Sequence, residues 1–327
     1  MIELDRIDRK LLYEVGINSR QPLAALAKRL HLGSDLVEYR LKRFIEKGYI
    51  KKLSVVVDPS ALGWTIFKTY LRISGARVKF DKLISELERH PRTYWLAEVA
   101  GTWNLVVSMW ARDVLDFQRI QDEVLAKFGP LVSAIDVFPL VEVEGYTRRF
   151  LVDQRNARYH FSMGSSLTQE LDDIDKRLLF GLSIDACKNA VDLAQEIGTT
   201  PAIVRYRIEK LQKLGVIRGY RIQIGYDELQ LTLFKVIIHR SRYDKESEEK
   251  LREFCRGNRN VLGFIRQLGS HTIEIEIEVS SHREFYAFTD QLYAACEREV
   301  QDIDSLVLRT DYHHRLPKAV IAPAGKV

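Results

Sequence analysis

The most constraining feature of this sequence is an internal repeat with an offset of 167 residues. Leu4-Asp5-Arg6-Ile7-Asp8 reappears as Leu171-Asp172-Asp173-Ile174-Asp175. Without any gap, residues 4–68 match residues 171–235 at 18 identical positions of 65. This period is too long for a solenoid, so the chain is interpreted as two fused copies of one unit of about 160 residues.

The composition fits a globular protein of two such units. The 327 residues correspond to about two domains' worth of chain, with 46% hydrophobic and 29% charged residues. No window approaches about 18 uninterrupted apolar residues, and the charged start Met1-Ile2-Glu3-Leu4-Asp5-Arg6 lacks the apolar core of a secretory signal. The three cysteines are far apart, which excludes a disulfide scaffold and favours a cytoplasmic location (Cys187, Cys255, Cys296). A net charge of +5 permits a nucleic acid partner without requiring one.

The first ~50 residues of each unit show helical periodicity. Apolar residues recur at helical spacing through three short segments, with a tight turn expected near residues 31–33. Thr200-Pro201 marks a helix start, and Gly48 and Gly215 suit helix C-terminal positions that need a positive φ. With a following β pair (Ile50–Val57 in one copy, Ile217–Ile224 in the other), each copy is predicted to begin with a winged helix-turn-helix.

The remainder of each unit alternates strand and helix patterns in the order βαββαβ, which is typical of the ferredoxin-like fold. In the first copy these elements are expected at 64–74, 79–89, 93–100, 103–111, 113–127 and 131–142. In the second copy they are expected at 231–240, 245–256, 260–268, 271–279, 281–296 and 303–312. The helices would cover one face of each sheet and leave the other face free to pair with a second copy.

The predicted fold class is therefore α+β, with two winged helix-turn-helix domains alternating with two ferredoxin-like βαββαβ domains. The residue ranges expected are 1–57 (first helix-turn-helix), 58–147 (first ferredoxin-like domain), 148–167 (linker), 168–224 (second helix-turn-helix), 225–316 (second ferredoxin-like domain) and 317–327 (flexible tail).

This organisation resembles the Lrp/AsnC family of prokaryotic transcriptional regulators. Four local patterns carry the resemblance: the repeated Leu-Asp-x-Ile-Asp opening, Val37-x-x-Arg40-Leu41 with Gly48-Tyr49-Ile50, Val204-x-x-Arg207-Ile208 with Gly215-Val216-Ile217, and Val57-Asp58-Pro59-x-x-Leu62-Gly63. The resemblance implies a sequence-specific regulator that binds double-stranded DNA and forms a homo-oligomer through its ferredoxin-like domains. It also implies an amino-acid-like small effector.

The effector loop of that family usually has the pattern Gly-x-x-Asp between the second and third strands. Here the two loops have no acidic residue, which argues against a free amino acid as the ligand. The resemblance places the candidate effector-binding residues at Gly101, Trp103, Asn104, Gly269, His271 and Thr272.

The predicted recognition helices expose different residues in the two copies. A helix in the major groove reads base edges with such side chains, and arginine is the best reader of guanine. The residues predicted to bind DNA are Ser34, Asp35, Glu38, Tyr39, Lys42, Arg43 and Lys52 in the first copy, with Thr200, Pro201, Ala202, Arg205, Tyr206 and Arg207 in the second. Unlike helices predict an asymmetric site, whereas a homodimer would prefer a palindrome.

Two repeated features allow more than one interpretation. Arg40 and Arg207 either contact phosphate or form internal ion pairs with the repeated Asp8 and Asp175. The strand pattern Ile273-Glu274-Ile275-Glu276-Ile277-Glu278 alternates strictly, so its three carboxylates share one face. That face is either solvated or meets a basic surface or an amine ligand across the sheet interface. The first copy has an apolar row at the matching strand positions, and an apolar row facing an acidic row would be a poor match. We therefore expect either that equivalent sheets of two chains pair with each other or that the two sheets of one chain pack off-centre.

The sequence has no nucleophile elbow, phosphate-binding glycine loop or metal-ligand spacing, so no catalytic residue, cofactor or metal site is predicted. Two alternatives stay open. Sirohaem decarboxylases resemble the same unit, and in them histidine and arginine residues near the second and third strands hold the tetrapyrrole; this chain offers Arg266 and His271 there. The second alternative is a partner subunit that does not bind DNA, and it is suggested by the acidic residues of the first predicted recognition helix.

Overall fold

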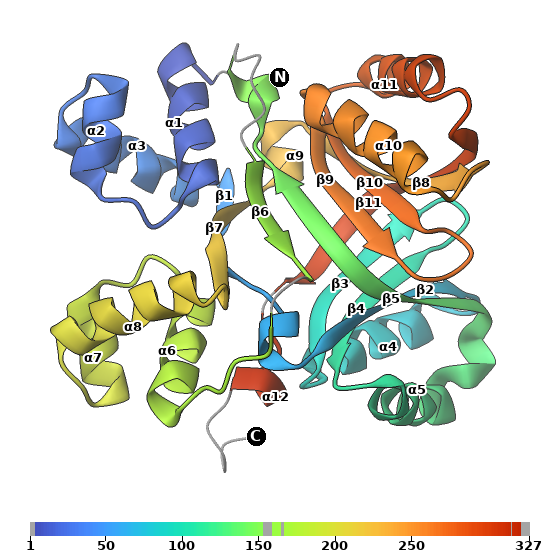
Figure 1. The fold of residues 1–327 in the computed structure, drawn as a ribbon, viewed down its shortest axis with the longest axis horizontal. Coiled ribbons are helices and arrows are strands. Elements are labelled where there is room, and N and C mark those ends of the chain that lie inside the picture. Colours follow the sequence, from blue (N-terminus) through green and yellow to red (C-terminus); the bar gives the residue numbers. More distant parts are fainter. Residues whose placement is uncertain (1–3, 153–158, 165–166, 315, 322–327) are drawn as a thin grey trace.

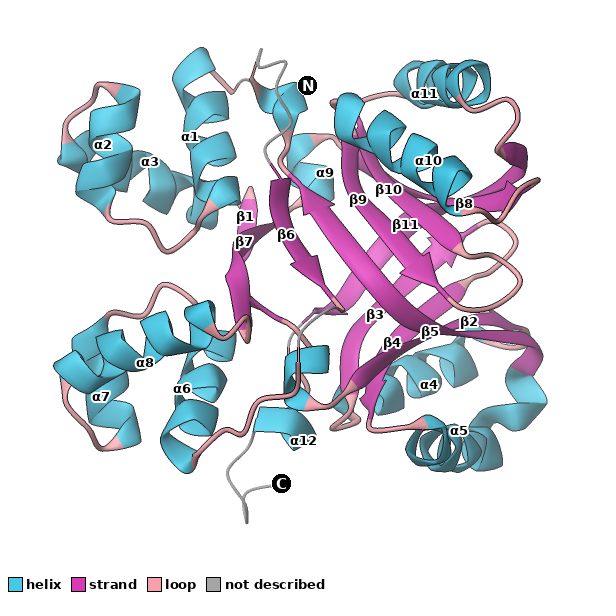
Figure 2. Ribbon diagram, in the orientation of Figure 1, coloured by secondary structure: helices cyan, strands magenta, loops and turns pink. Residues whose placement is uncertain are grey.

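A computed structural model describes residues 4–152, 159–164, 167–314 and 316–321. The two helix-turn-helix domains lie side by side at the left of Figure 1, and the strands of both ferredoxin-like domains form one body at the right. Helices flank this body on two opposite sides (Figure 2). Among the described residues, no helix has both the length and the apolar character needed to cross a membrane.

Each helix-turn-helix domain has three helices followed by one strand. The elements are α1 (Arg6–Ile17), α2 (Leu23–Leu30), α3 (Ser34–Glu46) and β1 (Ile50–Val57), then α6 (Asp173–Ile184), α7 (Ala190–Ile197), α8 (Pro201–Lys213) and β7 (Ile217–Ile224). The predicted helix start at α8 is confirmed, because the Thr200 hydroxyl accepts a hydrogen bond from the Ile203 amide at 3.3 Å. The positive φ predicted for Gly48 and Gly215 is also confirmed, at 71° and 72°.

The wing strands differ from expectation in their pairing. Each copy supplies one strand, and β1 pairs antiparallel with β7, so Val55 lies opposite Tyr220. The two helix-turn-helix domains therefore share one two-stranded ribbon. A β pair inside each copy could not be distinguished from this arrangement by sequence alone, because both require the same alternating strand pattern.

Each ferredoxin-like domain has the predicted βαββαβ order. The first comprises β2 (Thr65–Ile73), α4 (Arg77–Arg89), β3 (Thr93–Ala100), β4 (Leu105–Ala111), α5 (Val114–Phe128) and β5 (Val132–Tyr146). The second comprises β8 (Thr232–Arg240), α10 (Lys245–Gly257), β9 (Val261–Gln267), β10 (Ile273–Val279), α11 (His282–Ala295) and β11 (Val300–His314). Short helical segments complete the described chain: η1 (Ser60–Leu62), η2 (Gly129–Leu131), η3 (Arg149–Leu151), α9 (Tyr226–Leu229) and α12 (Lys318–Ile321).

The two sheets join into one closed ring within the chain. Strand β5 first pairs with β2 of its own copy and then with β9 of the other; β11 likewise pairs with β8 and then with β3. Each of these two strands has 15 residues, longer than expected, because its second half continues into the other copy's sheet. The first of the two expectations, that like sheets pair between chains, is wrong for these strands, since both junctions are formed inside this one chain.

The helix-turn-helix domains dock crosswise on the two copies. The core of the second one includes Val55 and Val57 of β1 together with Ile66 and Trp110 of the first sheet. The core of the first one includes residues of β7 and the segment after it, among them Ile222 and Leu229. The cores of the two copies are therefore interlocked rather than separate.

The segments expected as a linker and a flexible tail differ from that expectation where the structure describes them. Within 148–167, Arg149–Leu151 form η3 and Tyr159–Met163 form β6, which pairs with β5. Near the C-terminus, Lys318–Ile321 form α12, and Leu316 is buried against the second helix-turn-helix core. Residues 153–158, 165–166 and 322–327, which carry the rest of these two predictions, lie outside the described residues.

Candidate nucleic-acid interface and central cavity

Helix α8 presents the side chains predicted for a recognition helix. Val204, Ile208 and Leu211 are buried on its inner face. On its outer face Tyr206 is 63% exposed, and Ala202 and Arg205 are also exposed. Of the other predicted residues, Thr200 is exposed and caps the helix, and Pro201 is the half-buried first residue of α8.

Helix α3 has the same design with different chemistry. Val37 and Phe44 are fully buried, and Tyr39 is 62% exposed at the position equivalent to Tyr206. The other exposed residues of the predicted set on this helix are Ser34, Asp35, Glu38 and Lys42. The two helices therefore share a protruding tyrosine, but Glu38 in α3 stands where α8 has Arg205.

The repeated arginines form internal ion pairs. Arg40 pairs with Asp5 and with the buried Asp8, and Arg43 donates to Asp8 at 2.6 Å. In the second copy Arg207 pairs with both Asp172 and Asp175. Of the two interpretations, the helix-bracing ion pair is the one found in both copies. Arg43 and Arg207, which were predicted to bind DNA, are thus engaged in bracing the helices, and Lys52 is half-buried.

A stability measurement distinguishes bracing from phosphate contact. Replacing Arg207→Met is expected to lower the free energy of unfolding by about 1–3 kcal/mol, because the fully buried Asp175 would keep Lys210 as its one charged partner among the described residues. Urea denaturation gives this value, with Arg205→Met on the exposed face of the same helix expected to change it by less than about 0.5 kcal/mol. An Arg207→Met protein that is fully stable but weaker on every DNA duplex would contradict the bracing role.

The predicted effector loops contact the opposite copy. Gly101 and Gly269 have φ values of 143° and 139°. A Cβ at Gly101 would lie 2.7 Å from the Ser305 carbonyl oxygen, and one at Gly269 would lie 2.5 Å from the Phe138 ring. Both glycines therefore allow a hairpin to approach the other half of the chain closely.

The remaining residues of these loops are largely occupied by the protein itself. The side chain of Asn104 bonds both the amide and the carbonyl of Ile73, at 2.8 and 2.7 Å. Trp103 is buried, and the Thr272 hydroxyl accepts a hydrogen bond from Arg240. An aromatic chain links the two loops, running from Trp103 through Tyr70 and Phe138 to His271 with ring-centroid distances of 6.1, 5.5 and 4.8 Å.

The acidic row of β10 is buried, so its interpretation as a solvated face is wrong. Glu274 and Glu278 are both 0% exposed. One oxygen of Glu274, Oε1, accepts hydrogen bonds from Lys68 and Lys235 at 2.9 Å each, and the Tyr70 hydroxyl donates to its other oxygen. The carboxylates thus meet basic side chains of this chain across the interior of the ring, which is the second of the two interpretations.

The other two carboxylates of the row are also paired. Lys235 contacts Glu276, which lies directly opposite it in the strand pairing. Glu278 binds Arg148 through two hydrogen bonds of 2.8 and 3.0 Å, and the Tyr226 hydroxyl also donates to it. Every member of the row therefore has a cationic partner.

Burial and charge act in opposite directions on these groups. Burial alone would raise the pKa of Glu274, but Lys235, Lys68 and the Tyr70 hydroxyl outweigh it and lower the pKa to about 2. Burial lowers the pKa of Lys68, because Glu274 only partly offsets it and the neighbouring Lys235 lowers the pKa further. The pKa of Lys235 is raised, since two carboxylates outweigh its burial.

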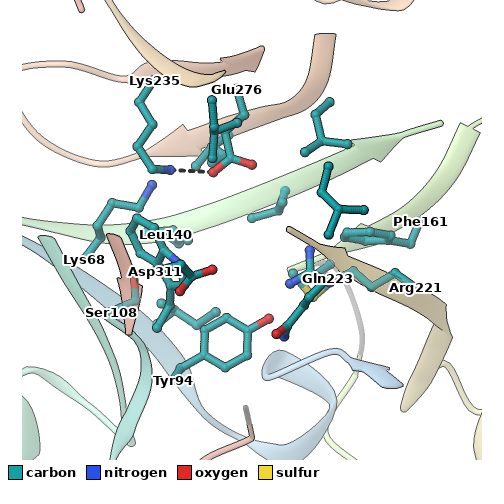
Figure 3. Close-up of a pocket in the computed structure, with 18 of the residues that line it drawn as sticks. Lys68, Tyr94, Ser108, Leu140, Phe161, Arg221, Gln223, Lys235, Glu276 and Asp311 are labelled. Atoms are coloured by element: carbon teal, nitrogen blue, oxygen red, sulfur yellow. Dashed lines mark hydrogen bonds and ion pairs between the residues drawn. The ribbon is translucent and has the colours of Figure 1, made fainter. Parts of the chain in front are cut away.

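A cavity of about 130 Å³ adjoins this network (Figure 3). It lies between the strands of the ring on one side and β6 and β7 on the other. Lys68, Lys235, Glu276 and Tyr94 reach it from strands of the ring, and Gln223 reaches it from β7. This site was not predicted from the sequence, although the repeat aligns Lys68 with Lys235 and so shows a lysine kept in both copies.

A family model described as winged helix-turn-helix DNA-binding matches the chain twice, over residues 4–51 and 171–218. Both matches cover the three helices and the start of the wing strand. They place the two predicted recognition helices in equivalent positions of the same DNA-binding motif.

Curated relatives have the length of one unit. The chain is 28% identical over 143 residues to the uncharacterized HTH-type transcriptional regulator PH1916 of Pyrococcus horikoshii, covering 43% of this chain and 95% of the relative. It is 29% identical over 121 residues to the HTH-type transcriptional regulator FL11 of Pyrococcus furiosus, covering 37% of this chain and 80% of the relative.

One solved structure is similar over nearly the whole chain. The crystal structure of the siroheme decarboxylase NirDL matches with a TM-score of 0.62, covering 96% of this chain and 94% of that chain. The sequence identity is 12%, so the likeness concerns the fold alone. It shows that this tandem arrangement of four domains also occurs in another protein.

Proposed function

Because this chain is a tandem pair of Lrp/AsnC-type units, we propose that it is a sequence-specific transcriptional regulator that reads DNA with helices α3 and α8. The observation that carries the proposal is the pair of exposed helix faces in the two matched DNA-binding motifs, each with a protruding tyrosine. Arg205 is the proposed base reader, Tyr39 and Tyr206 contact the DNA, and Lys42 contacts phosphate. Glu38 and Arg205 make the two half-sites unlike.

Fluorescence anisotropy tests this proposal with the full chain on its own upstream DNA and on a scrambled duplex. We expect tighter binding to the upstream DNA and an affinity that falls steeply with salt. The replacement Arg205→Ala should weaken binding to the upstream DNA by about 1–3 kcal/mol and leave the scrambled duplex nearly unaffected, because a base contact is sequence-specific.

Two matched variants control this prediction. Lys42→Ala should weaken both duplexes alike and reduce the salt dependence, as expected for a phosphate contact. Arg119→Ala removes the same charge as Arg205→Ala from an exposed position on α5, remote from both helix-turn-helix domains, and should change neither affinity. No binding at low salt would refute the proposal and favour a partner subunit that does not bind DNA.

The alternative of a sirohaem decarboxylase-like enzyme has the fold likeness to NirDL in its support. The side chains it would use are not gathered in this chain. Arg266 pairs with Glu248 of α10 on the helix-covered face of the sheet, whereas His271 lies in the loop before β10 and packs against Phe138. Among the described residues that line the central cavity there is no histidine. This placement favours the regulator over the enzyme.

Homo-oligomerisation and effector sensing stay part of this proposal. All eight ring strands find their partners within the chain, so self-association would use other surfaces of the ferredoxin-like domains. Light scattering of the purified protein measures the assembly. For an amino-acid-like effector, the loops at 101–104 and 269–272 are the sites that the resemblance implies, and their close contacts with the opposite copy would let a ligand there adjust how the two halves fit.

A further inference from the structure

The central cavity has the construction of a ligand site. Lys68 and Lys235 reach it from the ring, and their side chains are 3% and 2% exposed. Strands β6 and β7 form the opposite wall. Strand β6 pairs with the ring strand β5, whereas β7 pairs with β1 in a separate ribbon. The cavity therefore lies between two buried ammonium groups and a strand of another sheet, where a polar molecule can be bound.

The two ammonium groups are unequally neutralised. Lys235 has two carboxylate partners and lies 4.5 Å from the centre of the Trp95 ring. Among the described residues, Lys68 makes one hydrogen bond, to an oxygen of Glu274 that Lys235 also uses, and its Nζ lies 6.0 Å from the centre of the Tyr70 ring. An ammonium has three N–H donors, so Lys68 has capacity for an anionic acceptor placed in the cavity.

Apolar side chains line much of the rest of the cavity, beside the polar or charged Ser108, Arg148, Arg221, Gln223, Glu276 and Asp311. Leu140 and Val143 of β5, Met163 of β6 and Ile66 of β2 line it, and Phe161 and Tyr94 add aromatic surface. A bare inorganic anion would leave this surface uncovered, whereas an organic acid would bury its apolar part there. Lys68 and this apolar surface together suit a small molecule with one carboxylate and an apolar body, because Glu276 and Asp311 in the same lining would repel a second carboxylate.

We propose that the central cavity binds a small monocarboxylic acid, with its carboxylate on Lys68 and its apolar body between Leu140, Phe161 and Tyr94. The ligand also regulates DNA binding, and this part of the inference rests on the proposed DNA-binding function. It would contact β7, which follows α8 after a short turn and pairs with β1, which follows α3. A change at this wall is therefore transmitted to both recognition helices.

Phenylacetate is the test probe, with phenylacetamide as its uncharged counterpart and inorganic phosphate as an anion without an apolar body. We expect millimolar phenylacetate to raise the Tm of the full chain and calorimetry to yield a Kd. The amide and phosphate should each bind at least about tenfold more weakly, since each lacks one of the two contacts. Equal binding of all three compounds, or no binding of phenylacetate, would overturn the proposal.

Variants locate the site. Lys68→Met, which keeps the side-chain length, should weaken phenylacetate at least about tenfold. Gln223→Leu alters the β7 wall of the cavity and leaves the buried lysines and carboxylates in place, and it should change the Kd for phenylacetate. It replaces Lys68→Met as the test if that variant does not fold. Lys127→Met on the surface of α5 removes a lysine far from the cavity and should leave the Kd unchanged. Wild-type affinity in both cavity variants would refute the assignment.

DNA anisotropy with and without phenylacetate separates this inference from the proposed function. We expect the ligand to change DNA affinity at least about fivefold, and DNA to change ligand affinity by the same factor. If phenylacetate binds through Lys68 but the chain binds no DNA, the site stands and the regulator fails. If DNA binds with and without phenylacetate equally, the regulatory part of this inference is overturned while the DNA-binding function stands.

Discussion

Replacing Glu274→Gln is expected to lower the free energy of unfolding at neutral pH by about 3–5 kcal/mol. Glutamine has nearly the same shape but no charge, so the buried ammonium of Lys68 would lose its ion pair with Glu274, and Lys235 would keep its ion pair with Glu276. A fall in the pKa of Glu274 from 4.5 to about 2 corresponds to roughly 3 kcal/mol, which agrees with this range in order of magnitude.

The same substitution has a pH signature. Because the folded-state pKa of Glu274 lies below its unfolded value, the carboxylate contributes stability that is fully present above pH 4.5 and is lost as the pH falls toward about 2. The difference in stability between the wild type and Glu274→Gln should therefore shrink between pH 5 and pH 3. Urea denaturation across this range measures it.

A matched control lies on the surface. Glu123→Gln on α5 removes a carboxylate that is 59% exposed and lies 4.0 Å from Lys127, and it should cost less than about 0.5 kcal/mol. A Glu274→Gln protein with a stability deficit that stays constant from pH 7 to pH 3 would show that the ionised carboxylate is not what the variant has lost.

The course of the backbone was largely predictable from the sequence because local patterns determine it. Hydrophobic periodicity and helix-capping residues such as Thr200 act within a few residues, so the helices and the βαββαβ order follow from them. The ends of β5 and β11 did not follow. Their second halves pair with strands of the other copy, and the alternation of residues along a strand does not indicate which strand it pairs with.

The candidate sites show the same division. The exposed residues of α3 and α8 could be predicted, since knowing that Val37 and Val204 point inward determines which side chains point outward. The burial of Glu274 could not, because alternation shows that carboxylates share a face but not what covers it. Lys68 reaches Glu274 only because the two sheets close into a ring, and that contact spans 206 residues of sequence.

Replacing Trp110→Ala is expected to lower the free energy of unfolding by about 3–5 kcal/mol, which is typical of removing a large aromatic residue from a core. Trp110 is 0% exposed and lies opposite Ile66 in the strand pairing. It belongs to the same apolar cluster as Leu178 and Leu182 of α6. The cavity left by the truncation would therefore lie where the second helix-turn-helix domain docks on the first sheet.

Because the truncation at Trp110 would leave its cavity beside α6, its effect on backbone hydrogen exchange should be local. Hydrogen exchange in α6 should accelerate in Trp110→Ala more than exchange in α1, because α1 belongs to the other interlocked core. Tyr206→Ala, which truncates a 63% exposed aromatic residue of the same domain, should change stability by less than about 0.5 kcal/mol while weakening DNA binding. If Trp110→Ala lowered the free energy of unfolding no more than Tyr206→Ala does, the second helix-turn-helix domain would not depend on the first sheet for its core. The effect of a ligand bound between β7 and the ring could then not reach that domain through this contact.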